Sequence, residues 1–497
     1  MKKTTTFSVK YYLVLDVVAS RRKYIHFKLH ISPGTNEFPN NLTEPQHLVR
    51  GPLPDLLTMA HQAHNIPWTL LSSHLKYSRA NQCSCGVTNL HPRMQPNQGK
   101  ELTFFINAFI RNIKEHSTCE RKKYPAHYEP PSNDEIIIDE RTAMRIAPTI
   151  RRVKTHLNWE NTGKGSEVLE DRTVKLFLTE YRHTPCYQFL YFQRQGFLNL
   201  QVVATLLLYG EMETILRGCA HPDVAIEGWL DATECQCGYE LGWELVYEKA
   251  LTAYICLNLL YCFPETWDSA SSSSSSTGDE KKDYRDTKIY QYTVRTCTGK
   301  HKSADLVTYP HRQFFGIPDD YWSSAGFYVK NKQHWLRWSP HTCKYGFTSE
   351  NPGLYGLVPF REFLSLERPA EDEISYQPFG SDAALVRGLL CQKGLPIELA
   401  WDIMDLAGYE PTRRLRIEHD PLHPENREAL GKYLTYCWQI IVRCDMMARE
   451  IGMEISWHDV VSKCLVRMLD SKGCRHEKRW YRAEWDDDGG IWSHVFS

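Results

Sequence analysis

Two groups of cysteine and histidine residues have the types and spacing to bind a metal ion. In the first, thirteen residues separate Cys219-Ala-His221 from Cys235-Gln-Cys237, and a glycine follows directly. Thiolate sulfur and imidazole nitrogen are the usual ligands of tetrahedral zinc sites, so these four side chains predict zinc binding. Each pair encloses one residue, whereas the strong knuckle patterns enclose two. Buried thiols at helix ends and a surface histidine therefore stay open as the alternative.

A second, looser group combines His61 and His64 with Cys83 and Cys85. The histidines are three residues apart, which would place them on one face of a helix expected over residues 52–65. A polar helix face is the alternative interpretation. The two Cys-x-Cys-Gly units could also converge on one metal ion if the fold brings them together.

Catalytic motifs with a known mechanism are missing from the sequence. There is no G-x-S-x-G elbow, no S-x-x-K pair, no H-E-x-x-H motif and no G-x-G-x-x-G after an expected strand. Residues 163–166 (GKGS) lack the upstream glycine of a phosphate-binding loop, and the acidic run 486–488 lacks the spacing of a calcium loop. The sequence therefore identifies no catalytic residue. It favours a protein that is not an enzyme.

The elements that must position these residues are mainly helices. The spacing of apolar side chains predicts helices over residues 101–116, 168–181, 198–216, 239–262 and 396–407. Residues 288–298 and 326–338 alternate apolar and polar side chains, which is typical of strands.

The clearest local signals lie near the C-terminus. Pro424 occupies a favourable first helical position, and apolar residues then recur at steps of three and four as far as Ile451. Gly452 is a natural helix stop, and Ser456 with Asp459 resembles a capping box that opens another helix. We expect these two helices and residues 396–407 to pack into a bundle.

The same part of the chain resembles known proteins. Residues 394–469, which include the runs LPIEL and HDPLHPENRE, are similar to uncharacterised proteins of filamentous fungi that have no activity to transfer. Residues 395–408 resemble the first helix of an F-box, in which an L-P-x-E-L start precedes apolar residues that dock on the adaptor subunit of a cullin ubiquitin ligase.

The F-box resemblance implies a protein partner, bound through Leu395, Pro396, Leu399 and Ile403. An F-box runs directly into its second helix, however, whereas a charged, proline-rich loop over residues 409–424 intervenes here. A plain structural helix that begins with Leu-Pro is the alternative.

Composition narrows the class of protein. The chain has 497 residues, is 42% hydrophobic and 24% charged, and carries a net charge of −1, which makes a nucleic-acid partner unlikely on charge grounds. No apolar run approaches the roughly 20 residues of a membrane span. The sixteen cysteines are scattered, and many lie in the interiors of expected helices, as buried thiols do in a reducing compartment. We expect a soluble cytoplasmic or nuclear protein.

Six regions can be distinguished along the chain. They are a mixed N-terminal region (1–150), a helical region (151–266), a serine-rich flexible linker or loop (267–283), a β-rich region (284–375), a C-terminal helical module (376–475) and an acidic and aromatic tail (476–497). The expected fold class is α+β and mainly α. It comprises a helical body with a C-terminal helical bundle and a small β-rich portion at about 284–365.

The sequence leaves two functions from different classes. The first is a protein-interaction protein, F-box-like in its docking helix. The second is a zinc-binding protein or zinc-dependent enzyme whose Cys/His site is assembled by the fold. A group of aromatic residues within 321–338 could add a contact platform for a peptide, or could form a small core beneath the expected sheet.

Overall fold

The computed structural model divides the chain into two compact units. One unit comprises residues 1–56 and 380–411, and the other comprises residues 57–379 and 412–497. The structure describes residues 16–19, 25–28, 66–79, 87–92, 99–156, 172–179, 194–226, 244–268, 282–299, 306–317, 355–357, 359–365, 380–406 and 415–469.

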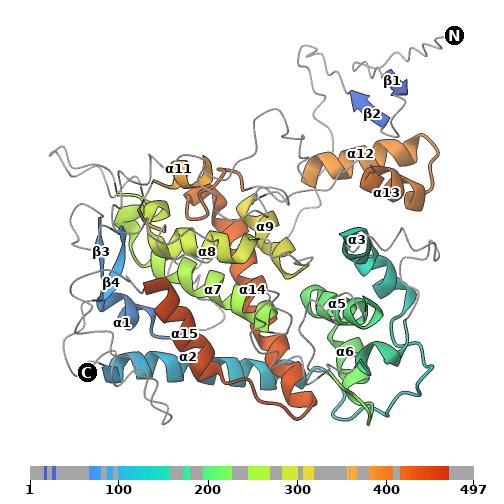
Figure 1. The fold of residues 1–497 in the computed structure, drawn as a ribbon, viewed down its shortest axis with the longest axis horizontal. Helices are drawn as coiled ribbons and strands as arrows, with labels where there is room; N and C mark the ends of the chain where they lie inside the picture. The colour runs from blue at the N-terminus through green and yellow to red at the C-terminus, as the bar shows by residue number, and fades with distance from the viewer. Residues whose placement is uncertain are drawn as a thin grey trace, which may run out of the picture. The chain divides into compact units, whose positions relative to one another are not determined.

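The larger unit is built mainly of helices (Figure 1). Its α-helices are α1 (Trp68–Ser73), α2 (Gly99–Arg121), α3 (Glu140–His156), α5 (Arg194–Tyr209), α6 (Met212–Cys219), α7 (Glu244–Tyr261), α8 (Lys288–Thr298), α9 (Tyr309–Phe315), α11 (Phe360–Ser365), α14 (Arg427–Glu450) and α15 (Trp457–Leu469). Short 3-10 helices are η3 (Val174–Phe177), η5 (Pro264–Thr266), η7 (Tyr284–Asp286), η8 (Leu306–Thr308) and η11 (Pro424–Asn426). Its strands β3 (Leu75–Ser78) and β4 (Asn89–Pro92) pair antiparallel, with Leu75 opposite Pro92.

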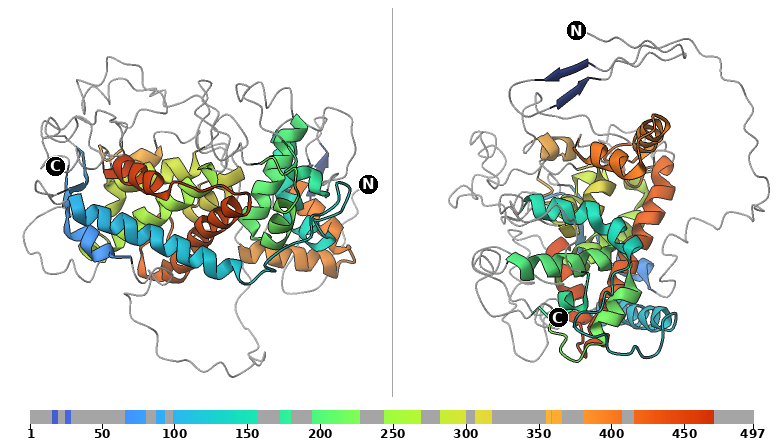
Figure 2. Two further views of the ribbon diagram at one scale, coloured as in Figure 1. Left: turned by 90° about the horizontal axis from the view of Figure 1, so that it is seen from below. Right: turned by 90° about the vertical axis from the view of Figure 1, so that its right-hand side faces the viewer.

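The core of this unit lies where α14 packs on α7 and α2. Phe105 and Phe109 of α2 meet Tyr254 of α7 and Trp438 of α14 in one aromatic cluster, with ring centroids of Tyr254 and Trp438 5.3 Å apart. Figures 1 and 2 show α2 running along the length of the unit, with β3 and β4 at one end and α5 and α6 at the other. A continuous apolar core therefore joins segments that are far apart in sequence.

A buried asparagine ties the small sheet to this core. The Asn89 side chain in β4 donates to the carbonyl of Met468 in α15 (3.2 Å) and accepts from the Ile289 N–H of α8 (3.1 Å). Because both halves of its amide are paired, its burial carries little penalty.

The smaller unit holds two pairs of elements. Strands β1 (Asp16–Ala19) and β2 (Ile25–Lys28) pair antiparallel, and helices α12 (Gly380–Gln392) and α13 (Ile397–Leu406) form a helical hairpin.

The expected fold class, α+β and mainly α, is confirmed. Helix α2 covers the segment predicted over 101–116, and α7 occupies residues 244–261 of the segment predicted over 239–262, of which residues 239–243 lie outside the described part. The prediction over 198–216 corresponds to α5 and α6, separated at Gly210 with φ +79°.

The helix ends predicted near the C-terminus are observed at the expected residues. Pro424 begins η11, which leads into α14 at Arg427, and Gly452 adopts φ +74° after α14. Ser456 directly precedes α15, where its Oγ donates to Asp459 Oδ2 (2.8 Å), a contact between side chains rather than the backbone hydrogen bonds of a capping box.

Three local predictions were wrong. Residues 288–298 form helix α8 rather than a strand, capped by Thr287 Oγ1, which accepts from the Tyr290 N–H. The β-branched and aromatic content of α8 resembles that of a strand, although Tyr290, Val294 and Cys297 also recur at the steps of four and three that are typical of a helix. In the segment 168–181, the described residues form a bridge at Thr173 and the short helix η3 instead of an α-helix.

The third correction concerns the C-terminal bundle. Helices α14 and α15 pack with α2 and α7 in the larger unit, whereas α13 packs on α12 in the smaller unit. Within the expected β-rich portion, residues 318–354 lie outside the described part of the chain, as do the serine-rich run and the tail. The described strands lie near the N-terminus instead.

None of the described helices has both the length and the apolar composition to cross a membrane.

Candidate functional site

The helical hairpin α12–α13 carries the residues that the F-box resemblance singled out. Helix α12 ends at Gln392, and Gly394 just beyond it has φ +88°, a left-handed conformation that glycine adopts without strain. The N–H of Gly394 donates to the Cys391 carbonyl (2.9 Å) and that of Leu395 to the Leu390 carbonyl (3.3 Å). This Schellman-type end turns the chain within four residues and places α13 beside α12.

Few side chains fill the space between the two helices. Ala383, Ala400 and Met404 are buried, and the guanidinium of Arg387 lies 4.9 Å from the ring centroid of Trp401. A cation over an indole face is attracted by the ring's quadrupole. Small buried side chains and one cation–π contact thus hold the hairpin together.

Most of the large apolar side chains of the hairpin remain exposed. Among the described residues, eight large apolar side chains are exposed, and five of them lie between residues 385 and 401: Leu385 (63%), Leu389 (40%), Ile397 (49%), Leu399 (48%) and Trp401 (39%). Leu385 and Leu389 share one face of α12, and Ile397 and Trp401 share one face of α13, because each pair is four residues apart. Single exposed leucines are ordinary, but such a concentration is typical of an interaction surface.

The four residues expected to bind a partner lie at the start of α13. Pro396 and Leu399 are exposed, and Leu395 and Ile403 are half-buried. The residues from Leu415 to His423 form a loop rather than a helix, so in this stretch the chain departs from the second helix that an F-box has.

The first predicted metal group is only partly within the described residues. Cys219 ends α6 and is buried, and burial raises the pKa of its thiol, which favours the protonated form over a metal-binding thiolate. His221 Nδ1 accepts from the Asp223 N–H (3.1 Å), so Nε2 carries the proton and donates to Asn133 Oδ1 (2.7 Å). Both nitrogens of His221 are therefore already paired.

The remaining predicted ligands lie outside the described residues. These are Cys235 and Cys237 of the first group and His61, His64, Cys83 and Cys85 of the second. Within the described part of the chain, no three His, Cys, Asp or Glu side chains are grouped closely enough to hold a metal ion. Zinc binding therefore stays a prediction.

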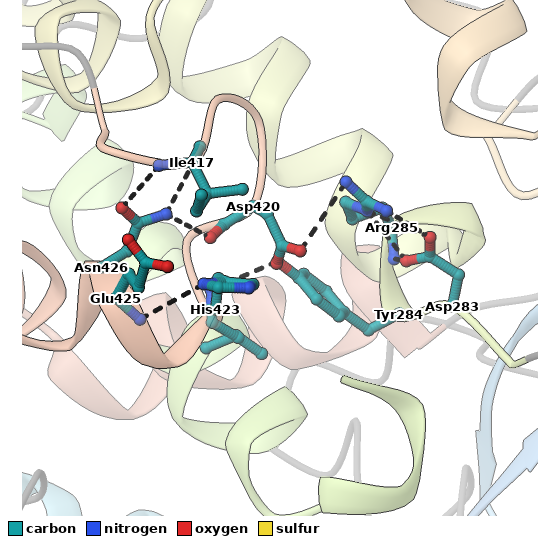
Figure 3. A network of polar contacts seen from close by, with 9 residues as sticks. Asp283, Tyr284, Arg285, Ile417, Asp420, His423, Glu425 and Asn426 are labelled. Atoms are coloured by element: carbon teal, nitrogen blue, oxygen red, sulfur yellow. Dashed lines mark hydrogen bonds and ion pairs between the residues drawn. The ribbon is translucent and has the colours of Figure 1, made fainter. Parts of the chain in front are cut away.

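A polar network holds the loop before α14 in place (Figure 3). The Asn426 amide, which is buried, donates to the carbonyls of Ile417 and Asp420 (both 2.7 Å) and accepts from the Ile417 N–H (3.0 Å). The hydroxyl of Tyr284 donates to Asp420 Oδ1 at 2.6 Å. Each polar group at the centre of this loop is thereby satisfied within the protein.

Charges in the same network are compensated. The Arg285 guanidinium binds both oxygens of Asp283, at 2.7 Å for the shortest contact, and lies 3.9 Å from Asp420. Burial acts to lower the pKa of Arg285, but the hydrogen bonds and charge of Asp283, with the charge of Asp420, raise it overall. The arginine stays charged and engaged, so this network fits a structural clamp between η7 and the loop.

A buried histidine pairs with a tyrosine deep in the larger unit. His311 of α9 lies 2.6 Å from the Tyr433 hydroxyl of α14, and burial, with the charges of Lys249 and Arg312, lowers the pKa of His311 to about 3. The ring of Phe314 stacks on Tyr433 with centroids 3.7 Å apart.

His311 and Lys249 were not predicted to be buried polar residues, and Leu385 and Leu389 were not predicted to be exposed apolar residues. No motif surrounds His311. Lys249 follows Glu244 and Glu248 in the first half of α7, so the sequence has no specific signal that its side chain is buried. The four-residue spacing of Leu385 and Leu389 was a visible helix signal.

Among the comparisons with known proteins, one protein family matches the chain. No curated protein and no solved structure matches the chain. The family described as "Gramillins biosynthetic cluster protein GRA5" matches residues 69–480, well over half of the 497 residues. The family is fungal, as the resemblance of residues 394–469 implied, and the match extends far beyond that segment. The chain therefore belongs to the family of gramillins biosynthetic cluster protein GRA5.

Proposed function

We propose that this protein acts as a protein-interaction subunit in a biosynthetic cluster and that the hairpin α12–α13 is its docking element. The description of the family supplies the biosynthetic setting. The observation that carries the proposal is the exposure of five large apolar side chains between residues 385 and 401. Full burial of a completely exposed apolar side chain gains roughly 1.5–3 kcal/mol. Because these side chains are between 39% and 63% exposed, a partner that covers them gains about half of that for each.

The partner that the docking helix favours is the adaptor subunit of a cullin ubiquitin ligase. The L-P-x-E-L start lies at the beginning of α13, where Pro396 and Leu399 are accessible to a second protein. Ile397 and Leu399, 49% and 48% exposed, are the large apolar side chains that a partner would cover there. The adaptor would cover this end of α13, and the larger unit would remain available to hold the client protein.

Binding of the purified full-length chain to the purified adaptor subunit tests this proposal. Isothermal titration calorimetry should give a measurable affinity that the triple change Leu395→Ala/Pro396→Ala/Leu399→Ala weakens by about tenfold or more, because removing one interface anchor costs on the order of 2 kcal/mol.

The matched control changes an exposed apolar residue outside the hairpin α12–α13. Met144→Ala removes a side chain that is 56% exposed on α3 of the larger unit and should leave adaptor binding within about twofold, since it lies outside the proposed docking element. Circular dichroism verifies that both variants retain their helices. If the unchanged chain does not bind the adaptor, this partner is excluded. If both variants weaken binding equally, the L-P-x-E-L start has no special role.

A further inference from the structure

The two strands of the smaller unit form a sheet with one apolar face. Alternate residues of a strand lie on the same face of a sheet. The register of β1 and β2 therefore places four apolar residues on one face in two cross-strand pairs, Val17 opposite Phe27 and Ala19 opposite Ile25. The other face holds the pairs Asp16–Lys28 and Val18–His26. The sheet β1–β2 is thus amphipathic.

A sheet of only two strands needs a further surface to be stable. An isolated pair of strands is marginally stable in water, and packing of its apolar face against a helix is one way to stabilise it. Residues 1–56 and 380–411 belong to the same compact unit, although they come from distant parts of the chain. In the described part of that unit, the helices are α12 and α13. The hairpin α12–α13 is therefore the helical surface that accompanies β1–β2.

The outer side of α12 has the apolar character that such a sheet requires. Ala383 is buried, and the half-buried Arg387 lies over Trp401 of α13, so these two residues mark the inner side of α12. Leu385 and Leu389 each follow one of them by two residues, which places both leucines on nearly the opposite side of the helix. Both leucines are exposed. An apolar surface on α12 therefore faces away from α13.

The two segments of this unit carry opposite net charges. Residues 1–56 contain eight lysine or arginine residues and four aspartate or glutamate residues. Residues 380–411 contain two lysine or arginine residues and five aspartate or glutamate residues. Opposite charges favour the association of the two segments, whereas like charges oppose the association of either segment with a second copy of itself. The charges thus favour the N-terminal segment over a second copy of the hairpin.

We propose that the apolar face of β1–β2 docks on the exposed apolar side chains of the hairpin α12–α13 and covers them until a protein partner displaces it. The exposed fractions of 63% for Leu385 and 40% for Leu389 belong to the uncovered hairpin. This contact, the N-terminal cover, would bury the same side chains that a partner needs. The cover is independent of the identity of the partner, whereas its regulation of docking rests on the function proposed above.

Hydrogen exchange of the purified full-length chain, with no partner added, tests the N-terminal cover. Phe27→Asp puts a carboxylate on the apolar face of β1–β2. Burial of an unpaired carboxylate is strongly unfavourable, so the hairpin should be uncovered in this variant. We expect the backbone amides of α12 and α13 to exchange at least about tenfold faster than in the unchanged chain, because covered amides exchange only when the contact opens.

His26→Asp is the matched control. It introduces the same residue at the neighbouring position, on the opposite face of the sheet, and should leave the exchange of α12 and α13 unchanged. Ile25→Asp, a second change on the apolar face, should repeat the effect of Phe27→Asp. Amides of α14, in the larger unit, are the internal reference and should exchange equally in all four chains.

Two outcomes would overturn the N-terminal cover. One is equal exchange of α12 and α13 in the unchanged chain and in both variants of the apolar face. The other is an equal acceleration in His26→Asp, because the apolar face would then have no special role.

Titration with the purified adaptor subunit tests the regulation separately. The adaptor should bind Phe27→Asp at least about tenfold more tightly than the unchanged chain, because a binding-competent state that is seldom populated lowers the apparent affinity. Equal affinities for the two chains would overturn the regulation. An adaptor that binds neither chain would exclude the proposed partner and its regulation, while the exchange rates would still decide whether the cover forms.

Discussion

At the scale of single residues, the buried Asp445 carboxylate joins three helices. It accepts from Ser117 Oγ of α2 (2.5 Å) and from Trp457 Nε1 of α15 (2.7 Å), and it pairs with Arg449 on its own helix α14 (2.9 Å). Charged hydrogen bonds of this kind are the strong ones, and removing their shared acceptor leaves the Ser117 and Trp457 donors unpaired in the core.

We therefore expect Asp445→Ala to lower the free energy of unfolding by about 3 kcal/mol, as for other broken buried ion pairs. Urea unfolding followed by fluorescence measures the change. Glu454→Ala is the control, because it removes an exposed carboxylate that pairs with Lys114, and it should have no measurable effect. Equal effects of the two changes would contradict a special role for Asp445.

The buried His311 predicts how stability depends on pH. Its pKa falls to about 3 in the folded chain, from an ordinary value of 6.5, because of burial and then the charges of Lys249 and Arg312. The unfolded chain therefore binds the proton first as the pH falls. The contribution of neutral His311 to stability is complete above pH 6.5 and declines toward pH 3.

Below pH 6, His311 should make the free energy of unfolding fall by up to about 1.4 kcal/mol for each pH unit. We expect His311→Phe to lack this part of the pH dependence. Urea unfolding of both proteins at several pH values measures the two slopes. Other groups titrate in the same range, so the difference between the two proteins is the informative quantity. Parallel curves would show that His311 does not carry this dependence.

At the scale of elements, two glycines of the hairpin α12–α13 have different roles. Gly394 follows the end of α12 with φ +88°, a conformation that other residues adopt at a cost. Gly388 lies within α12 with no atom near the position of an added Cβ. The same chemical change at the two positions should therefore act in opposite directions.

Gly394→Ala should destabilise the hairpin by about 1–2 kcal/mol, and Gly388→Ala should stabilise it by up to about 1 kcal/mol. Hydrogen exchange of the backbone amides of α12 and α13 reports the local change, faster in the first variant and slower in the second. A slower exchange in Gly394→Ala would contradict the left-handed turn.

At the scale of the whole molecule, the larger unit has one continuous apolar core in which most of the described cysteines are buried. Burial is the main cause that raises the pKa of the thiols of Cys219, Cys256, Cys297, Cys437, Cys444 and Cys464. Neutral, buried thiols are poor nucleophiles. Cys119 on α2 is exposed instead.

Labelling with iodoacetamide should therefore modify Cys119 quickly and the six buried cysteines only as fast as the core opens. Mass spectrometry of the digested protein at increasing times measures each rate, and Cys119→Ser removes the fast site among these seven. Rapid labelling of Cys437 or Cys297 in the folded chain would show that the core is open to small molecules near His311.

The sequence by itself determined the class of the fold and the local features of its helices. The start of η11, the end of α14 and the start of α15 followed from Pro424, Gly452 and Ser456, because helix ends depend on residues close in the chain. The same local reasoning failed for α8, because its β-branched and aromatic residues favoured a strand over the helical spacing of Tyr290, Val294 and Cys297.

The tertiary structure alone decided which side chains could act. His311 and Tyr433 are 122 residues apart, and Asn89 reaches Met468 across 379 residues, so no spacing in the sequence could pair them. Four cysteines and histidines looked alike as candidate ligands until the structure paired both nitrogens of His221 within the protein. Leucine is a residue type that is usually buried, yet the side chain of Leu399 is exposed. Whether a side chain is buried depends on which neighbours the whole chain places beside it.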